Sequence, residues 1–335
     1  MQFSVSPIVY NFLIESISEL ELDLENIENR LGYRLHYTKG RVSFIRTLRL
    51  WKSIEQLSNR TDIGLILADY FTIEKAGLLG EVFLNGHTIK ESMLMVNRYL
   101  PLLMSNISMK YQEVGNRVVF SFNFFPEIFI PFSVLEFYMK ICYNWVSRFL
   151  RREDIQSFNI YEIHYFAREP LHLHYYKKKF PKTKLYFFDF NNYVIMDRDT
   201  FYVPNTHYKK SVYEYIMVYA TEMKSDVLNQ GSFSALIADH ILMDLGERSH
   251  SIQQLSKDIN MSVSSIKRKL KAEDSSFKEL SNHIKKELCT IMILDIQLRY
   301  EDISFLLGYS DYSAFYKAFK KWFKMTPTQY RENFL

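Results

Sequence analysis

Apolar residues recur at helical spacing in the first hundred residues of the chain. One face is formed by Ile14, Ile17, Leu20 and Leu24. A second face, within residues 88–103, is formed by Met93, Val96, Leu100 and Leu103. Because residues three or four positions apart lie on the same side of an α-helix, these intervals predict a mainly helical beginning.

The pattern changes to an alternation of apolar and polar residues between 107 and 124. The two alternating runs flank Gly115-Asn116, and a short polar dipeptide containing glycine is typical of a tight hairpin turn. We therefore expect a β-hairpin here. After it we expect a helix over 130–152, a strand over 157–165, a helix over about 170–180 and a strand over 183–195. These elements predict an α+β fold for the first part of the chain.

The strand-like pattern ends near residue 204. Pro204-Asn205-Thr206 indicates a turn, a helix is expected over 213–223, and residues 229–232 have the composition of a short linker. Every later segment has helical spacing. We place the domain boundary near residue 230, with a mixed α/β domain over 1–230 and an all-α domain over 231–335.

The second domain begins with two short helices and a tight turn. Ser251 can cap the first helix, with Gln254 completing a capping box, and Ser262 can cap the second directly after a turn at 260–261. In the second helix one face is apolar, with Val263, Ile266 and Leu270, and the other is basic, with Lys267, Arg268 and Lys271. Two short helices of which the second is basic predict a helix-turn-helix.

A comparable pair follows a long amphipathic helix over 277–294. Asp302 can cap a helix over 303–307, Gly308 suits its C-terminus, and Asp311 can cap a helix with Phe315 and Phe319 facing inward. At about 1.5 Å per residue the connecting helix spans roughly 25 Å. That length is of the order of one turn of DNA, about 34 Å. A last helix is predicted by Thr326, Pro327 and Gln329.

Two stretches of this domain, MSVSSIKRKLKAEDSSFKEL (261–280) and ISFLLGYSDYSAFYKAFKKWFKMTPTQYR (303–331), resemble AraC/XylS-type bacterial transcriptional regulators. The resemblance extends over about 235–333 and implies two helix-turn-helix units that enter successive major grooves of promoter DNA. By position, the implied candidates for base contacts are Ser264, Ser265, Lys267, Arg268, Tyr312, Ser313, Tyr316 and Lys317. The candidates for phosphate contacts are Lys271, Lys320 and Lys321.

Three positions depart from the pattern of that family. Ser304 stands where alanine is usual, Lys324 where glycine is usual, and Tyr300 where a small aliphatic residue is common. We expect the Ser304 hydroxyl to bond back to the preceding helical turn. Lys324 is expected to adopt a left-handed conformation at a modest energetic cost.

Residues 77–122 resemble the N-terminal domain of an AraC-type subgroup called arabinose-binding-like, which differs from the cupin barrel of the arabinose regulator. We extend this resemblance over about 10–205. It implies a domain for effector sensing or dimerisation, and two hypotheses stay open. The domain binds a small molecule or lipid in an apolar pocket and forms a homodimer, or it has an aromatic core, dimerises and takes no ligand.

The resemblance also implies contact with RNA polymerase and hence activation of transcription, and repression stays open as well. A constitutive, dimeric architectural DNA-binding protein is the alternative. Net charge does not show whether the protein binds DNA, because the whole chain carries only +4 and the charges of 232–335 nearly balance. The clusters of lysine and arginine at 267–271 and 317–324 favour DNA binding more than the total does.

The amino-acid composition indicates which broad class of protein this chain belongs to. Hydrophobic residues make up 47% and aromatic residues 16% of 335 residues, which is typical of a globular chain. Cys142 and Cys289 lie in apolar surroundings and predict buried thiols in a reducing compartment. The apolar stretch 128–146 is interrupted by charges and the N-terminus lacks a signal peptide, so we expect a cytoplasmic protein without a membrane span.

No motif for catalysis or a cofactor is visible. The sequence lacks a phosphate-binding glycine loop, a nucleophile elbow and a zinc-protease helix, so we expect no enzyme activity. His164, His172 and His174 are the only suggestive titratable cluster. On a strand, the rings of His172 and His174 would share a face and could hold a metal. In the helix that we expect there they diverge, so no metal site is predicted.

Overall fold

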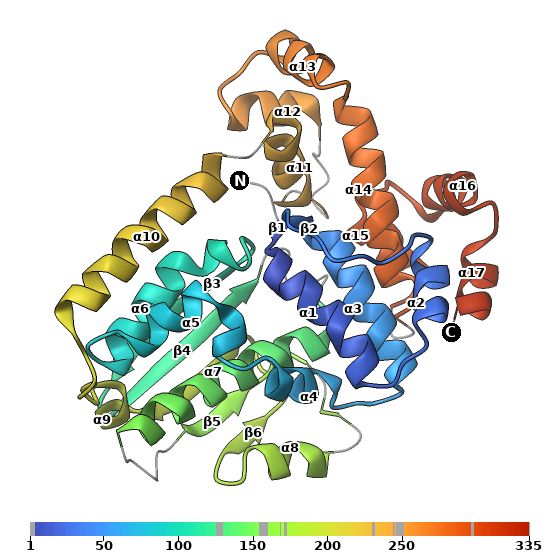
Figure 1. Ribbon diagram of the computed structural model, residues 1–335. Coiled ribbons are helices and arrows are strands. Elements are labelled where there is room, and N and C mark those ends of the chain that lie inside the picture. The colour runs from blue at the N-terminus through green and yellow to red at the C-terminus, as the bar shows by residue number, and fades with distance from the viewer. Residues whose placement is uncertain are drawn as a thin grey trace.

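The computed structural model describes residues 4–124, 130–153, 160–167, 169–170, 173–229, 232–243, 245, 251–295 and 298–334. Figure 1 shows helices and one main sheet in the first two thirds of the chain, and only helices from α11 onward. This is the fold class that the sequence predicts, an α+β region followed by an all-α region.

Six α-helices form the first hundred residues. They are α1 (Pro7–Glu19), α2 (Leu24–Leu31), α3 (Phe44–Ser58), α4 (Ile63–Tyr70), α5 (Leu78–Leu84) and α6 (Ile89–Tyr99), with the 3-10 turns η1 (Glu74–Ala76) and η2 (Leu100–Leu102). The face predicted from Ile14 to Leu24 does not belong to one helix. Glu21 has a φ of 53°, which breaks the helix, and Leu24 begins α2 with its side chain exposed.

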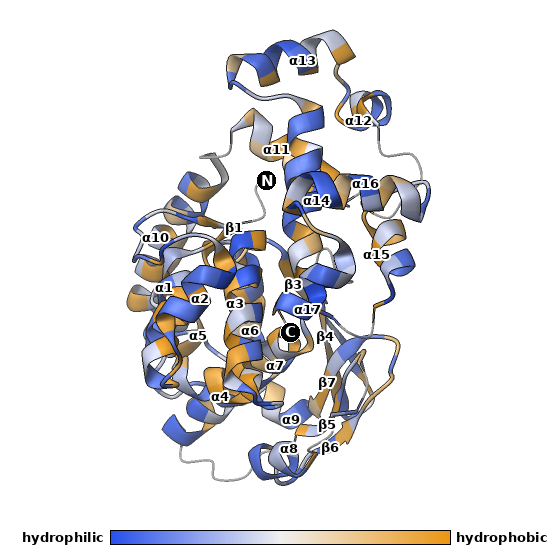
Figure 2. Cartoon of the chain, turned by 90° about the vertical axis from the view of Figure 1, so that its right-hand side faces the viewer, coloured by the Kyte–Doolittle hydropathy of each residue, from blue (hydrophilic) through white to orange (hydrophobic). Residues whose placement is uncertain are grey.

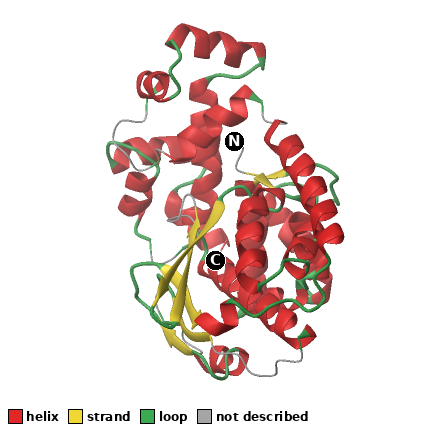
Figure 3. Ribbon diagram, turned by 90° about the vertical axis from the view of Figure 1, so that its left-hand side faces the viewer, coloured by secondary structure: helices red, strands yellow, loops and turns green. Residues whose placement is uncertain are grey.

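The predicted hairpin is present as β3 (Ile107–Val114) and β4 (Arg117–Phe124), with Val114 opposite Arg117 and Gly115 at a φ of 60°. The hairpin forms one side of a five-stranded sheet with the order β3-β4-β7-β5-β6. Figure 3 shows this sheet in yellow beside the helices. Only the β5–β6 pair is parallel. Every second side chain of β4, from Val118 to Phe124, is buried in the core.

The strand predicted over 183–195 is two strands, and that prediction was wrong. They are β6 (Lys184–Tyr186) and β7 (Asn192–Asp197), which pair with opposite edges of β5 (Ile160–His164). Between them Phe188 has a φ of 61°, and its N–H donates to Ala167 O at 2.7 Å. The loop therefore folds back beside the end of β5 before the chain returns as β7. The expected strand began at 157, but residues 154–159 lie outside the described part.

Helix α7 (Phe132–Arg152), expected over 130–152, is the centre of the N-terminal core. It crosses α4 closely at Gly64, where a Cβ would lie 2.0 Å from Ser133 O. The predicted helix near 170–180 is α8 (Leu173–Lys179). His174 lies on it, whereas His172 is outside the described residues.

The chain then runs through α9 (Arg198–Phe201), α10 (Lys210–Asn229) and α11 (Phe233–Met243). The expected helix over 213–223 is the middle of the longer α10. The boundary that we expect at 230 falls between α10 and α11, and residues 230–231 lie outside the described part. Both cysteines are free and buried. None of the helices within the described ranges is long and apolar enough to cross a membrane.

Two short strands, β1 (Ser4–Val5) and β2 (Val42–Ser43), connect the beginning of helix α3 to the middle of the N-terminal domain. β1 pairs with β2, and Ser43 also caps α3 by accepting from Arg46 N–H. β1 makes a further antiparallel bridge from Val5 to Met104. Helix α3 is thus held at its beginning by a strand that reaches into the middle of the N-terminal domain.

Candidate DNA-binding surface

The first helix-turn-helix consists of α12 (Ile252–Asp258) and α13 (Val263–Ala272). Ser251 caps α12 by accepting from Gln254 N–H, but the Gln254 side chain donates to Asp258 instead, so only half of the expected capping box forms. Asn260 has a φ of 55° in the turn. Ser262 then caps α13 by accepting from Ser265 N–H.

Helix α13 is amphipathic in the predicted sense. Ile266 and Leu270 are fully buried, whereas Lys267, Arg268 and Lys271 are exposed. Figure 2 shows the α12–α13 pair at one end of the molecule, remote from the sheet. The three cations therefore project from a surface that the N-terminal domain does not cover.

Two serines of α13 are hydrogen-bonded to the N-cap residue of the helix, and Lys269 points away from the basic face. The Ser262 hydroxyl lies 2.9 Å from Ser264 Oγ and donates to Ser265 Oγ at 2.8 Å, so the N-cap orients both hydroxyls. Lys269, part of the basic cluster in the sequence, turns back toward α11, with its Nζ 5.0 Å from the ring centre of Phe233. Lys269 is thus directed away from the face of Lys267 and Arg268.

The second unit consists of α15 (Tyr300–Leu306) and α16 (Tyr312–Phe323). Asp311 caps α16 as expected, and the N–H of Ala314 that it accepts lowers the pKa of its carboxyl group. Gly308 has a φ of 69° after α15. Asp302 does not cap α15, because that helix begins earlier. Its carboxylate instead accepts from the backbone and guanidinium of Arg299, the N-cap residue.

The outward face of α16 carries the remaining candidates. Phe315 and Phe319 are fully buried, and the exposed candidates are Ser313, Lys317, Lys320 and Lys321. Tyr312 and Tyr316 are half-buried, with ring centres 5.9 Å apart. Lys320 Nζ lies 5.8 Å from the centre of the Tyr316 ring. The two tyrosines thus form an aromatic edge beside the lysines.

Two departures from the family pattern have a structural role. Ser304 is buried, but its hydroxyl donates to Asp311 O at 3.0 Å and does not bond to the preceding turn as expected. It therefore links α15 to the start of α16. Lys324 adopts the left-handed conformation that was predicted, with a φ of 60°, at the C-terminus of α16.

Helix α14 (Phe277–Met292) connects the two units, and α17 (Pro327–Phe334) closes the domain. Thr326 and Gln329 form a complete capping box for α17. Arg331, on α17, donates to three carbonyl oxygens after α14, those of Ile293, Asp295 and Leu298, at 2.8–3.0 Å. This arginine fixes the chain between α14 and α15. Arg331 is not among the candidates predicted from the sequence, although it lies in the stretch 303–331 that resembles the family.

The N-terminal domain contacts α14 directly. Arg49 of α3 donates to Glu287 of α14 at 2.8 Å, and Arg30 of α2 donates to Phe334 O at 3.0 Å. The side chains of Arg49 and Glu287 are only 15% and 18% exposed. The pair is separated by more than two hundred positions, and no local pattern in the sequence indicates it.

The titratable cluster of the N-terminal domain is an internal network. His164 Nδ1 lies 2.7 Å from Asp189 Oδ2, and its ring is stacked between Tyr186 and Tyr193. His174 is on another element. Among the residues that the structure describes, no three His, Cys, Asp or Glu side chains gather in a way that could hold a metal ion.

Comparison with protein families identifies both regions. Residues 255–333 match a helix-turn-helix domain family. Residues 33–181 match the arabinose-binding domain of AraC transcription regulator, N-terminal. The two matches lie on either side of the boundary expected at 230.

Individual relatives match about a quarter of the chain. The ornithine utilization regulator of Pseudomonas aeruginosa is 30% identical over 81 residues, 24% of each chain. The regulator VqsM of the same species is 26% identical over 84 residues, 25% of this chain and 26% of VqsM. The matched segment thus spans about a quarter of these relatives. The crystal structure of CdpR from Pseudomonas aeruginosa covers 92% of this chain and 98% of its own at 15% identity and a TM-score of 0.44.

Proposed function

Since the chain belongs to the AraC family of DNA-binding transcriptional regulators, which are not enzymes, we propose that it activates transcription from specific promoters under control of its N-terminal domain. The observation that carries this proposal is the pair of amphipathic helices α13 and α16. Each buries an apolar face and exposes lysine or arginine, and the 16-residue α14 holds them apart.

The candidate residues divide by their surroundings. Lys267, Arg268 and Lys317 are exposed on the outward faces, and in the proposed complex they contact base edges together with Ser264, Ser265, Tyr312, Ser313 and Tyr316. Lys271, Lys320 and Lys321, near the C-terminal ends of α13 and α16, contact phosphates. Phosphate contacts set affinity and its salt dependence, whereas base contacts set sequence choice.

Substitution of the two groups should separate these roles. Arg268→Ala and Lys317→Ala are expected to lower affinity for the operator about 5- to 150-fold and to relax specificity. Lys321→Ala should weaken binding to all sequences alike and reduce the salt slope by about one. Lys39→Ala, an exposed lysine of the N-terminal domain, is the control. Unchanged operator affinity in both Arg268→Ala and Lys317→Ala would contradict the assignment of the recognition helices.

We further propose that the protein is a homodimer that pairs through α10. Its inner face is fixed to the domain by buried Ile216 and Ala220. Its outer face carries an unpartnered apolar stripe, with Tyr215 at 75% exposure. We call this the α10 stripe, and its residues are Val212, Tyr215, Val218, Tyr219 and Met223. Contiguous exposed apolar surface of this kind marks an interaction site.

Charge favours a second copy of this chain as the partner. Lys209 and Lys210 lie at the beginning of α10, and Glu222 and Asp226 lie near its end, all exposed. Two antiparallel copies of α10, related by a two-fold axis, place the lysines of each against the carboxylates of the other. The same residues serve both subunits, as an isologous interface requires.

Sedimentation of the full chain tests the dimer. Tyr215→Asp should yield a monomer, because a charge at the centre of the stripe is desolvated without a partner. Tyr37→Asp, at a similarly exposed tyrosine outside the stripe, should leave the dimer intact. Reversal of Lys209 and Lys210 to Glu should weaken it, and added reversal of Glu222 and Asp226 to Lys should restore it. A Tyr215→Asp protein that sediments like the wild type refutes the α10 interface.

Regulation is tested in the native host by genome-wide footprinting of the full chain and the Arg268→Ala/Lys317→Ala variant, together with transcription by RNA polymerase in vitro. We expect a few sharp promoter peaks that the variant loses, and more transcript with the wild-type protein. Diffuse occupancy without change in transcription would favour the constitutive architectural alternative.

A further inference from the structure

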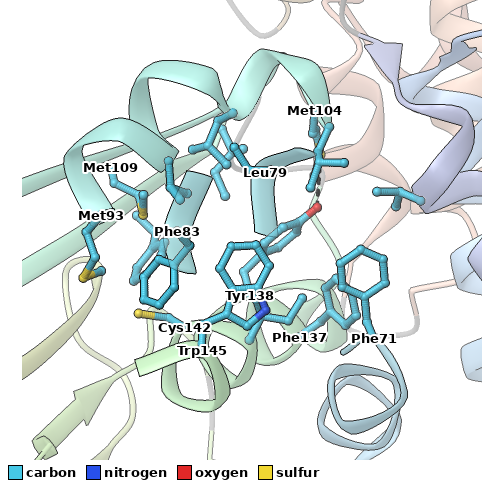
Figure 4. A pocket seen from close by; sticks show the side chains of 17 residues that line it. Phe71, Leu79, Phe83, Met93, Met104, Met109, Phe137, Tyr138, Cys142 and Trp145 are labelled. Atoms are coloured by element: carbon cyan, nitrogen blue, oxygen red, sulfur yellow. Dashed lines mark hydrogen bonds between the residues drawn. The ribbon is translucent and has the colours of Figure 1, made fainter. Parts of the chain in front are cut away.

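The core of the N-terminal domain contains a cavity of about 70 Å³. It lies between α5, α6 and α7, the hairpin β3–β4 and the segment after η2 (Figure 4). Its lining is almost wholly hydrocarbon and sulfur, and among the residues that the structure describes no lysine, arginine, histidine, aspartate or glutamate belongs to it. The cavity is distinct from the DNA-binding surface, and the description "arabinose-binding" does not match its chemistry, because a sugar needs several hydrogen-bonding groups.

The few polar atoms of the lining come from one face of α7. Tyr138, Cys142 and Trp145 follow one another at helical intervals, and Figure 4 shows them side by side. The Tyr138 hydroxyl donates to Met104 Sδ at 3.4 Å, and a thioether is a weak acceptor. The Trp145 indole N–H is buried and has no hydrogen-bond partner among the described residues. Both groups are donors that a stronger acceptor would satisfy.

The lining also stays uncharged. Burial raises the pKa of the Cys142 thiol to about 12 and likewise raises the pKa of the Tyr138 hydroxyl well above its usual value. An ionised ligand would therefore find no counter-charge in a medium of low polarity, and the desolvation of an unpaired carboxylate or ammonium group is very costly.

We propose that this cavity binds an uncharged, mainly hydrocarbon molecule that carries one carbonyl or ether oxygen, which accepts from Trp145 and Tyr138. This site would be where the effector proposed above binds, and its biological role rests on that proposed function. The oxygen faces α7, and the hydrocarbon part packs against the residues of α5, α6 and β4, such as Phe83, Val96 and Phe122.

The size of the cavity limits the rigid part of the ligand. An apolar cavity of about 150 Å³ holds benzene, so the present space of about 70 Å³ holds roughly half of a six-atom molecule without movement. A ligand of the size of 2-pentanone or longer requires displacement of side chains. Met93, Met104 and Met109 come from three different elements around the cavity. Methionine is unbranched and adaptable, so these side chains can yield to a longer chain where β-branched residues could not.

The first test compares ligands of equal size by calorimetry on the full chain. We expect 2-pentanone to bind with a Kd of about 1 mM. Butanoate, a charged analogue of the same size, and L-arabinose should give no binding at about tenfold that concentration. Among 2-pentanone, 2-heptanone and 2-nonanone, affinity should first rise with chain length. No binding of any ketone, or equal binding of butanoate, overturns the proposal.

The second test uses a variant that keeps the fold. Trp145→Phe removes the unpartnered N–H but keeps an aromatic ring, so the relief of a buried unsatisfied donor offsets part of the cost of the enlarged cavity. It should weaken the binding of 2-pentanone about three- to tenfold without weakening the binding of cyclopentane. Trp322→Phe, in α16, is the control and should change the affinity for neither ligand. An unaltered affinity of Trp145→Phe for the ketone overturns the assigned hydrogen bond.

Operator binding measured with and without 2-heptanone separates this inference from the proposed function. If the ketone binds and operator affinity changes, both stand. If the ketone binds and operator affinity stays constant, the site stands and effector control through it fails. If no ketone binds but the operator is still recognised, the cavity proposal fails and the DNA-binding function is untouched.

Discussion

The contact between Arg49 and Glu287 gives a direct test of how firmly the N-terminal domain holds the DNA-binding domain. The two side chains meet at 2.8 Å, and each is more than four-fifths buried. Glu287→Gln keeps the shape but removes the charge. Arg49 then retains its hydrogen bond to Leu31 O at 2.8 Å, which limits the loss.

The magnitude follows from the burial of the pair. A hydrogen bond to a charged group contributes about 1.5–3 kcal/mol, and the loss of one partner of a fully buried pair costs about 3–5 kcal/mol. Because this pair is partly exposed and Arg49 keeps a second acceptor, we expect Glu287→Gln to destabilise the docked domain by about 1–3 kcal/mol. The coupling free energy between the two positions should be about 1–2 kcal/mol.

A double-mutant cycle of Arg49→Gln and Glu287→Gln measures this coupling. Urea unfolding of the full chain is followed by tryptophan fluorescence, which reports on Trp322 of α16 together with Trp51 and Trp145 of the N-terminal domain. Separate transitions are fitted, because a protein of several domains need not unfold in one step. The pair Arg299–Asp302 is the control, since its side chains are 77% and 39% exposed and its coupling should be at most about 0.5 kcal/mol. A coupling below about 0.3 kcal/mol for Arg49–Glu287 would refute the reasoning that this contact fixes α14.

Three further predictions concern single positions. Lys324→Gly should stabilise the DNA-binding domain by about 1 kcal/mol in thermal unfolding, because a left-handed conformation costs a residue with a Cβ about that much; a lower Tm would contradict this. Gly64→Ala should destabilise the protein by about 1–3 kcal/mol or more, since the new Cβ meets Ser133 O, and an unchanged Tm would refute the close approach. Burial raises the pKa of Glu136 well above 4.5, so its contribution to stability is present below pH 4.5 and is lost as the pH rises through the folded pKa. The stability of Glu136→Gln should therefore increase relative to that of the wild type as the pH rises. Urea unfolding from pH 4 to 9 measures this difference.

Local signals in the sequence are sufficient to predict the structure where it depends only on neighbouring residues. The caps Ser262 and Asp311, the turn at Gly115 and the left-handed Lys324 are all as expected. Each follows from a few backbone angles and a side chain two or three positions away. The same signals were misleading where a second partner competed. The amide of Gln254 bonds to Asp258, one turn later on the same helix.

Contacts between distant segments could not be predicted. Nothing near Ser304 indicates that its hydroxyl reaches the carbonyl of Asp311, because that depends on the angle between α15 and α16. The split into β6 and β7 depends on the docking of Phe188 against the end of β5. The cavity likewise arises from the spacing of several elements that are distant in sequence, although the sequence indicates an apolar, aromatic interior.

One continuous set of contacts leads from the cavity to α14. Met104 of the cavity wall bridges to Val5 of β1, and the half-buried Arg41 donates to both Ser4 and Leu102 O at 2.8–2.9 Å. β1 pairs with β2, which runs directly into α3, and α3 carries Arg49. A ligand that displaces Met104 must strain these bonds or move β1. Allosteric coupling amounts to about 1–3 kcal/mol, the size of one such contact. If the proposed ligand moves this wall, we expect the position of α14 and hence operator affinity to change, and by reciprocity DNA binding would change ligand affinity by the same factor.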